Sequence, residues 1–263
     1  MGIKQILLHL DHSRGCDNRM QVGLELSKRF DARLLGVFVL QDYMVPAYAE
    51  AQISMDMIVD IRSQSKARAK HQAGLYKALA KKAAVDFQVR IEEGPLTPIL
   101  REHSKYADLL LSGQDNPDDP DNSSYAVADD MLLEGACASL VVPHSGTIKP
   151  PGERILLAWN ASREAARAVR AALPLLQAAQ QVVVISSEHI ADYLEAHGVA
   201  SVSSGIGDPD SSPAQAIIAQ AADMHADLIV MGAYGHMRLR EIILGGVTRE
   251  LLKKAPLPLL MAH

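Results

Sequence analysis

The sequence predicts an α/β protein made of two tandem five-stranded parallel open sheets with helices on both faces. Continuous apolar runs alternate with segments of helix-forming residues, which is the pattern of parallel strands buried on both faces. Three short motifs recur in the same order in the two parts of the chain. A stretch rich in Pro, Gly and Ser at residues 144–152 separates these parts. We therefore expect two domains, residues 1–145 and 152–263, called here the first half and the second half.

The first half starts with an apolar strand, and the elements that follow alternate between helix and strand. Asp11-His12-Ser13 is a turn and helix-cap signal, and Leu24, Leu26 and Phe30 lie in the helix after it. The expected elements are strands over 3–10, 34–40, 85–91, 108–112 and 139–142, helices before 30 and over 55–84, 94–106 and 126–136, an irregular segment over 41–54 and a polar loop over 114–124.

The second half repeats three motifs of the first, in order and with similar residues. The matched pairs are 6–13 with 155–162, 107–113 with 226–232, and 138–142 with 258–262. The second half is shorter, since residues 188–198 hold at most a short helix where the first half has a long one. A repeat of this kind indicates a duplicated domain with right-handed crossovers.

In such sheets a ligand binds beyond the carboxyl ends of the strands, where the strand order reverses. Two loops of the second half follow strand ends: Ala158-Trp159-Asn160, and the glycine-rich stretch that starts at Gly232. That stretch continues through Gly235 to Gly245-Gly246, and a helix is expected from Val247. A strand, a glycine-framed loop and a helix start let backbone N–H groups surround a phosphate. The spacing matches neither the P-loop nor the dinucleotide fingerprint.

Composition excludes several classes of function. The net charge of −5 and the 4% aromatic content argue against binding to nucleic acid or to an anionic membrane. Cys16 and Cys137 are expected to be reduced thiols of a cytoplasmic protein, because two cysteines form no disulfide framework. We expect neither a signal peptide nor a membrane span.

Other polar residues of the chain match no recognisable site. His9, Asp11 and His12 match no metal motif, and the acidic loop 115–121 lacks the Glu and the glycine register of a calcium loop. Ser186-Ser187 and His189 are close in sequence, but nothing marks them as a catalytic triad. We therefore expect no catalytic residues and no metal-binding residues.

The order of these motifs resembles that of the universal stress proteins in their tandem, two-domain form, whose fold is Rossmann-like. In the ATP-binding branch of that family the glycine loop holds the triphosphate, and the end of the first strand lies near the base and ribose. The resemblance covers nearly the whole chain. It implies a cofactor-binding set of Ala158, Trp159, Asn160, Met231, Gly232, Tyr234, Gly235, Gly245, Gly246, Val247 and Thr248.

The chain departs from that family pattern in three ways. Gly246 stands where the family has Ser or Thr, and Asn160 stands where it has an acidic residue. In the first half Asn116 and Tyr125 replace the later glycines, and Asp115, Asp118, Asp119 and Asp121 would repel a triphosphate. We therefore expect nucleotide in the second half only.

Several roles remain open from sequence. Thr248 is either a phosphate ligand or a first-turn hydroxyl. Arg238 and Arg240 reach phosphates or solvent. Trp159 stacks on a base or packs in the core.

The resemblance implies a cytoplasmic, non-enzymatic stress-response regulator that binds ATP, with or without Mg, and acts on an unidentified partner. The alternatives are an interaction module without nucleotide, a slow ATPase, or an adenylate-handling enzyme.

The resemblance also implies how the two halves assemble. The family pairs subunits through the final strand, and Leu140–Val142 and Leu259–Met261 are short apolar strands that need edge partners. We expect the two halves to pair as an intramolecular pseudo-dimer. The same logic allows a homodimer between chains.

Overall fold

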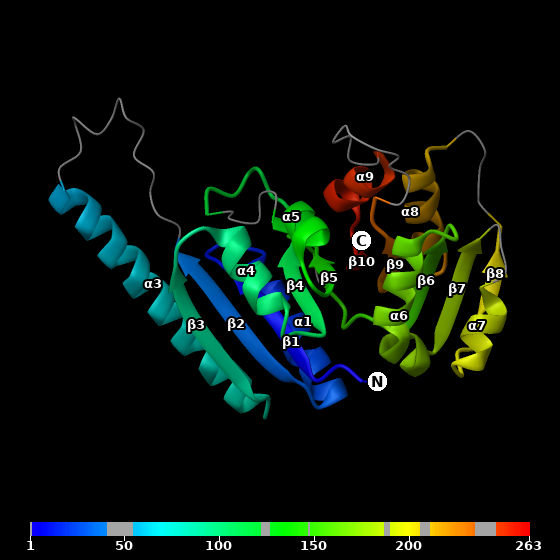
Figure 1. Cartoon of the computed structure of the whole chain (residues 1–263), viewed down its shortest axis with the longest axis horizontal. Helices are drawn as coiled ribbons and strands as arrows, with labels where there is room; N and C mark the ends of the chain where they lie inside the picture. Colours follow the sequence, from blue (N-terminus) through cyan, green and yellow to red (C-terminus); the bar gives the residue numbers. More distant parts are fainter. Residues whose placement is uncertain are drawn as a thin grey trace.

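The apolar runs form the strands of one ten-stranded sheet, in the order β3-β2-β1-β4-β5-β10-β9-β6-β7-β8 (Figure 1). The computed structural model describes residues 2–40, 55–121, 127–146, 148–186, 190–205, 211–234 and 246–263. The strands are β1 (Gln5–Leu10), β2 (Arg33–Leu40), β3 (Phe87–Glu93), β4 (Leu109–Gly113), β5 (Ala138–Val142), β6 (Arg154–Trp159), β7 (Gln181–Ser186), β8 (Val202–Ser204), β9 (Leu228–Gly232) and β10 (Leu259–Ala262).

Helices cover both faces of this sheet. Those whose side chains join one core cluster are α1 (Cys16–Phe30), α3 (Met55–Lys82), α6 (Arg163–Ala178) and α7 (Ala191–Ala196). The helices of the opposite face are α4 (Leu96–Ser104), α5 (Val127–Glu134), α8 (Pro213–Asp223) and α9 (Gly246–Lys254). Successive strand residues alternate between the faces, as Leu7 and Leu8 do. The predicted α/β class with helices on both faces is confirmed.

Both halves have the same strand order. The first half runs β3-β2-β1-β4-β5 and the second runs β8-β7-β6-β9-β10, with the strands of each half parallel. The order therefore reverses between β1 and β4 in the first half and between β6 and β9 in the second. These two switch points are the places where ligands are expected.

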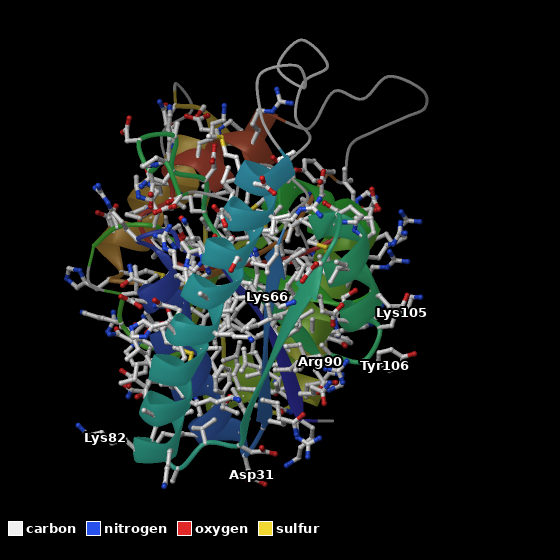
Figure 2. All side chains as sticks on the ribbon, turned by 90° about the vertical axis from the view of Figure 1, so that its left-hand side faces the viewer. Asp31, Lys66, Lys82, Arg90, Lys105 and Tyr106 are labelled. Atoms are coloured by element: carbon white, nitrogen blue, oxygen red, sulfur yellow. The ribbon has the colours of Figure 1, made fainter. Side chains whose placement is uncertain are left out.

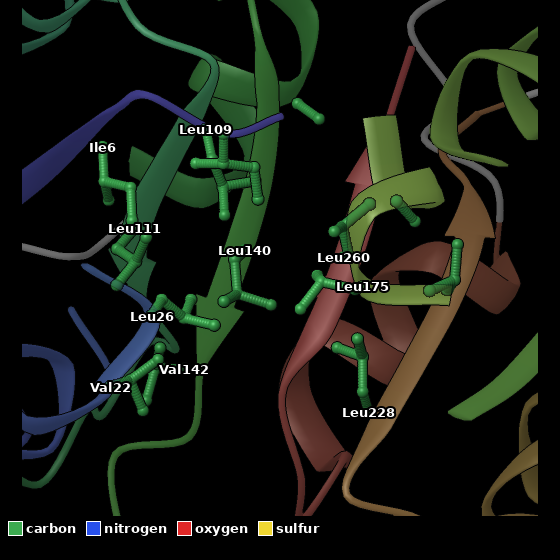
Figure 3. Packing of buried hydrophobic residues seen from close by; sticks show 14 of the residues in the cluster. Ile6, Val22, Leu26, Leu109, Leu111, Leu140, Val142, Leu175, Leu228 and Leu260 are labelled. Atoms are coloured by element: carbon green, nitrogen blue, oxygen red, sulfur yellow. The ribbon is translucent and has the colours of Figure 1, made fainter. Parts of the chain in front are cut away.

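The two halves join through their final strands. β5 pairs with β10 in an antiparallel manner, and Leu140 is the register partner of Leu260 (Figure 3). Both side chains are fully buried, and the core cluster around them contains residues of both halves. The predicted intramolecular pairing is present, but it makes one continuous sheet instead of two separate ones. It also occupies both edges on which the expectation of a homodimer between chains rested.

One repeated motif has a clear structural task. Asp108 and Asp227, which precede β4 and β9, bind backbone N–H groups at the start of the neighbouring strand. Asp108 accepts from Lys4 and Gln5 at 2.7 and 2.9 Å. Asp227 accepts from the N–H groups of residues 152–154 at 2.6–3.1 Å. The Ala-Asp pair of the repeat therefore fixes the amino ends of β1 and β6.

The halves differ most between their second and third strands. The first half has the 28-residue helix α3 there, and the second has the six-residue helix α7. Figure 2 shows α3 running alongside the edge strand β3, and Lys66 pairs with Glu93 at 2.7 Å. The sequence predicted this difference, but it placed the end of α3 at residue 84, two residues beyond the observed end at Lys82. It also placed β3 two residues too early, at 85–91.

Candidate functional site

The carboxyl ends of β6 and β9 lie side by side at the switch point of the second half. The two strands pair in parallel, with Ala158 opposite Met231. Trp159 and Asn160 therefore emerge next to Gly232. The two loops selected from the sequence therefore begin at adjacent strand ends, and this place, marked by Trp159, Asn160 and Gly232, is named here the crevice of the second half.

The candidate residues on the strands divide between the two faces of the sheet. Met231 is buried in the core cluster beneath α8 and α9, and Ala158 packs against that cluster. Trp159 packs on the opposite face, against the cluster that includes α6. The indole is half-buried there, so its contact with the core is the role that the structure shows.

Gly232 is required by a close approach of backbone to backbone. A Cβ atom at this position would lie 2.4 Å from Ala165 N and 2.8 Å from Glu164 C, both in the first turn of α6. No side chain fits into such a gap without moving the strand or the helix. The first motif glycine thus brings the end of β9 against the amino terminus of α6.

Asn160 begins a tight polar turn that caps α6. Its Oδ1 accepts from Ser162 N at 3.2 Å and from Ser162 Oγ at 2.7 Å. Ser162 Oγ in turn accepts from Ala165 N at 3.1 Å, which satisfies a free N–H of the first helical turn. The Asn160 amide therefore holds the N-cap residue Ser162 in place, a task for which no charge is needed.

Helix α9 begins beside this crevice. Gly246 is exposed, and a Cβ added to it would meet no atom within 4 Å. Val247 is half-buried against the core, whereas Thr248 is buried and its Oγ1 accepts from Tyr234 N at 3.3 Å. The first turn of α9 thus presents an open backbone at Gly246 and turns the Thr248 hydroxyl inward.

Four predicted residues lie outside the described residues: Gly235, Gly245, Arg238 and Arg240. Their expected phosphate contacts remain predictions. The described members of the set are Ala158, Trp159, Asn160, Met231, Gly232, Tyr234, Gly246, Val247 and Thr248.

The switch point of the first half has the same polar turn, but here an arginine side chain pairs with the residue that begins the turn. Asp11 Oδ1 accepts from Ser13 N at 3.1 Å and from Ser13 Oγ at 2.6 Å, as Asn160 does from Ser162. Asp11 also forms an ion pair with Arg19, and both side chains are buried. Arg19 additionally donates to the carbonyl oxygen of His9 at 3.2 Å.

Sequence reasoning missed Arg19. The signal that could have revealed it is the alignment of Ser13 with Ser162, which places Arg19 opposite the buried Ala168. Where the second half has a small apolar residue, the first half therefore has a buried guanidinium that neutralises Asp11.

The acidic loop of the first half folds over this region. Asp119 is buried and accepts from Arg14 N at 2.7 Å, directly after the Asp11 turn. Asp121 forms a two-pronged pair with Arg68 of α3, at 2.9 and 2.7 Å. Two of the four carboxylates that would repel a triphosphate, Asp119 and Asp121, are thus bonded to the first half's own groups.

His9 adds a buried neutral imidazole beneath that turn. It is 1% exposed, and no partner for its Nδ1 is found among the described residues. Burial lowers the pKa of His9 to about 4; Arg19 acts in the same direction and Asp11 in the opposite one. The imidazole is therefore uncharged at neutral pH.

The described residues contain neither a candidate metal centre nor a candidate membrane span. No group of three or more His, Cys, Asp or Glu in this part of the chain could hold a metal ion. No helix among the same residues is long and apolar enough to cross a membrane.

The fold and its crevices define a duplicated, doubly wound α/β protein with one switch point in each half. Residues 210–263 match the model of the universal stress protein family. This stretch of the chain resembles that family and contains α8, β9, α9 and β10.

Known proteins show the same likeness. A universal stress protein of Synechocystis is 39% identical over 46 residues, which are 18% of this chain and 16% of that relative. Another, of Methanocaldococcus jannaschii, is 41% identical over 49 residues, or 19% of this chain and 30% of the relative. The matched stretches therefore span less than a third of either relative. The solved structure of a universal stress protein of Archaeoglobus fulgidus, 17% identical, superposes with a TM-score of 0.74 over 98% of this chain and 95% of its own. It shares the fold over the whole length.

Proposed function

We propose that the second half binds ATP at its switch point and that the protein acts as a non-enzymatic, nucleotide-dependent regulator. The observation that carries this proposal is the convergence of β6, β9 and α9 on an open backbone. The carboxyl ends of the two strands are adjacent, and α9 begins nearby at the exposed Gly246. The amino terminus of a helix favours an anion through its unpaired N–H groups and its dipole.

The site would bind phosphate through backbone groups more than through side chains. Thr248 and Tyr234 turn their hydroxyl groups toward other protein groups, and the Asn160 amide oxygen accepts from Ser162, the N-cap residue of α6. Gly246 has room for a ligand atom close to its backbone. Any Mg would arrive with the phosphates of the nucleotide, which commonly supply its ligands.

The first half is proposed not to bind nucleotide. The Asp11–Arg19 pair and the buried Asp119 occupy its switch point. One nucleotide per chain follows from this asymmetry.

An ATP titration followed by thermal unfolding and calorimetry tests the proposal. Gly246→Asp adds a carboxylate in open space at the start of α9, so it should weaken ATP binding at least tenfold while the fold stays intact. Gly74→Asp is the matched control, because Gly74 also faces open space but lies on α3. Gly246→Ser restores the family's hydroxyl and should tighten binding. Absence of ATP binding by the wild-type protein at millimolar concentration would refute the proposal.

The second candidate function is an interaction module without nucleotide. The inward-turned hydroxyl groups of Tyr234 and Thr248 favour it, because they remove two side-chain donors from the crevice. Under this alternative none of the three proteins, the wild type, Gly246→Ser and Gly246→Asp, would bind ATP.

A further inference from the structure

Tyr234 occupies an unusual place at the root of the glycine stretch. It lies two residues beyond Gly232, yet its side chain is only 4% exposed and belongs to the core cluster beneath α9. Its backbone φ is +61°, in the left-handed region that favours glycine. A bulky residue stays in such a conformation only where its surroundings hold it.

Two hydrogen bonds hold Tyr234, and they lead to different halves of the chain. Its N–H donates to Thr248 Oγ1 at 3.3 Å, in the first turn of α9. Its phenol O–H donates to Asp129 Oδ1, in the first turn of α5. One residue therefore joins the amino-terminal turns of two helices that follow equivalent strands. Figure 1 shows α5 and α9 on either side of the middle of the sheet.

The surroundings keep this connection in place. Neighbouring Asp130 accepts from Thr97 Oγ1 at 2.8 Å, which fastens the first turn of α5 to α4. The ring of Tyr234 lies edge-on to His263, with 6.2 Å between ring centroids. Burial and the hydrogen bond to Asp129 raise the pKa of the Tyr234 phenol, which keeps it protonated as a donor.

We propose that Tyr234 is a positioning residue that couples the crevice of the second half to helix α5 of the first half. This inference rests on the proposed nucleotide binding. An anion at the start of α9 orders the turn that carries Thr248, and Tyr234 conveys that ordering to Asp129. Because coupling between sites is reciprocal, fixing α5 also tightens binding in the crevice. The first half thus reports on occupancy without binding nucleotide itself.

Hydrogen exchange measured by mass spectrometry with and without ATP tests the coupling. In the wild-type protein ATP should slow amide exchange in α9 and also in α5. Tyr234→Phe keeps the ring and the N–H donor to Thr248 but removes the phenol donor. In this variant the effect on α9 should remain, the effect on α5 should disappear, and ATP affinity should fall about fivefold or more.

Two further variants complete the design. Asp129→Ala removes the acceptor from the first half and should reproduce the loss in α5, which covers the case in which Tyr234→Phe fails to fold. Tyr106→Phe removes a hydroxyl from a tyrosine that is 70% exposed on the outer surface, and it should behave like the wild type (Figure 2).

The outcomes separate the two proposals. If the wild type binds ATP but α5 still responds to ATP in Tyr234→Phe and in Asp129→Ala as it does in the wild type, the coupling is overturned and the proposed function stands. If the wild type binds no ATP, the proposed function and the coupling both fall. Loss of the α5 response in both variants, with the α9 response retained, supports the coupling. A tyrosine with a merely structural role would change the exchange of both helices together.

Discussion

Arg19 and Asp11 form a buried ion pair at the end of β1, and the repeat places Ala168 and Asn160 at the equivalent positions of the second half. The arginine side chain is 1% exposed and that of the aspartate 4%. A buried charge is tolerated only when it is paired. The two differences between the halves, Asp11 against Asn160 and Arg19 against Ala168, therefore belong together. At these positions the first half has both charges and the second half has neither.

Removing the arginine alone should leave Asp11 as an uncompensated buried charge. We expect Arg19→Ala to lower the free energy of unfolding by about 3–5 kcal/mol, measured by urea denaturation. The control is Arg33→Ala, which breaks the exposed Arg33–Asp86 pair and should change stability by about 1 kcal/mol or less.

The double variant Arg19→Ala/Asp11→Asn reproduces the residues of the second half. It should recover much of the stability lost in Arg19→Ala, because the remaining amide can still accept from Ser13. If the double variant were no more stable than Arg19→Ala, the account of paired charges would be wrong.

Two glycines of the motif should respond in opposite ways to alanine. Gly232→Ala places a methyl group 2.4 Å from Ala165 N and should lower stability by about 1–3 kcal/mol or more, as overpacking does. Gly246→Ala meets open space at a helix start and should be neutral or stabilising by at most about 1 kcal/mol. Denaturant midpoints of the two variants give the comparison. Equal destabilisation by both would contradict the close approach of β9 to α6.

His9 should make stability depend on pH. Its pKa is about 4 in the folded protein and 6.5 in the reference state, so the unfolded chain binds the extra proton between these values. Stability should therefore fall as pH drops from 6.5 toward 4, by a total on the order of 3 kcal/mol.

The variant His9→Leu isolates this contribution, because it removes the titrating group. Unfolding free energies measured from pH 7.5 to pH 4.5 should fall less steeply in His9→Leu than in the wild type. His71→Gln, at an exposed position of α3, serves as control and should keep the wild-type slope. Parallel curves for the wild type and His9→Leu would show that His9 is not held neutral by burial.

The junction of the halves should make unfolding cooperative. Leu140 and Leu260 are fully buried partners across β5 and β10, and both core faces contain residues of the two halves. Leu260→Ala should cost about 2–5 kcal/mol and leave a single unfolding transition. Leu133→Ala, at a residue 44% exposed, should cost about 0.5 kcal/mol or less. Two separate transitions in the calorimeter would show that the halves unfold independently.

The arrangement of strands could be predicted because it depends on repeated local patterns. The apolar run before Gly232 and its echo before Gly113 indicate equivalent strands, and the short apolar runs at 139–142 and 258–262 indicate a need for edge partners. A buried parallel strand has a continuous apolar sequence, and its short length and flanking turn residues distinguish it from a buried helix segment.

The site was less predictable because its details depend on partners distant in sequence. Tyr234 reads as a loop residue, and nothing local indicates that its hydroxyl meets Asp129, 105 residues earlier. Arg19 reads as a surface residue of an amphipathic helix, because arginine is rarely buried without a partner. The sequence allows Thr248 to be either a phosphate ligand or a first-turn hydroxyl, and it does not indicate that the hydroxyl oxygen accepts from Tyr234 N. Each of these contacts depends on where a polar side chain finds its hydrogen-bond partner, which only the tertiary structure decides.

The antiparallel pairing of β5 with β10 has a consequence for how such a protein can change. In a symmetric dimer of identical subunits every substitution appears twice, so one site cannot be altered without the other. Here the pairing joins two stretches of one polypeptide, and each can vary alone. A charge such as Arg19 can enter one half while its counterpart remains Ala168. The two halves therefore pair as the subunits of a dimer do, while each half can change its residues independently of the other.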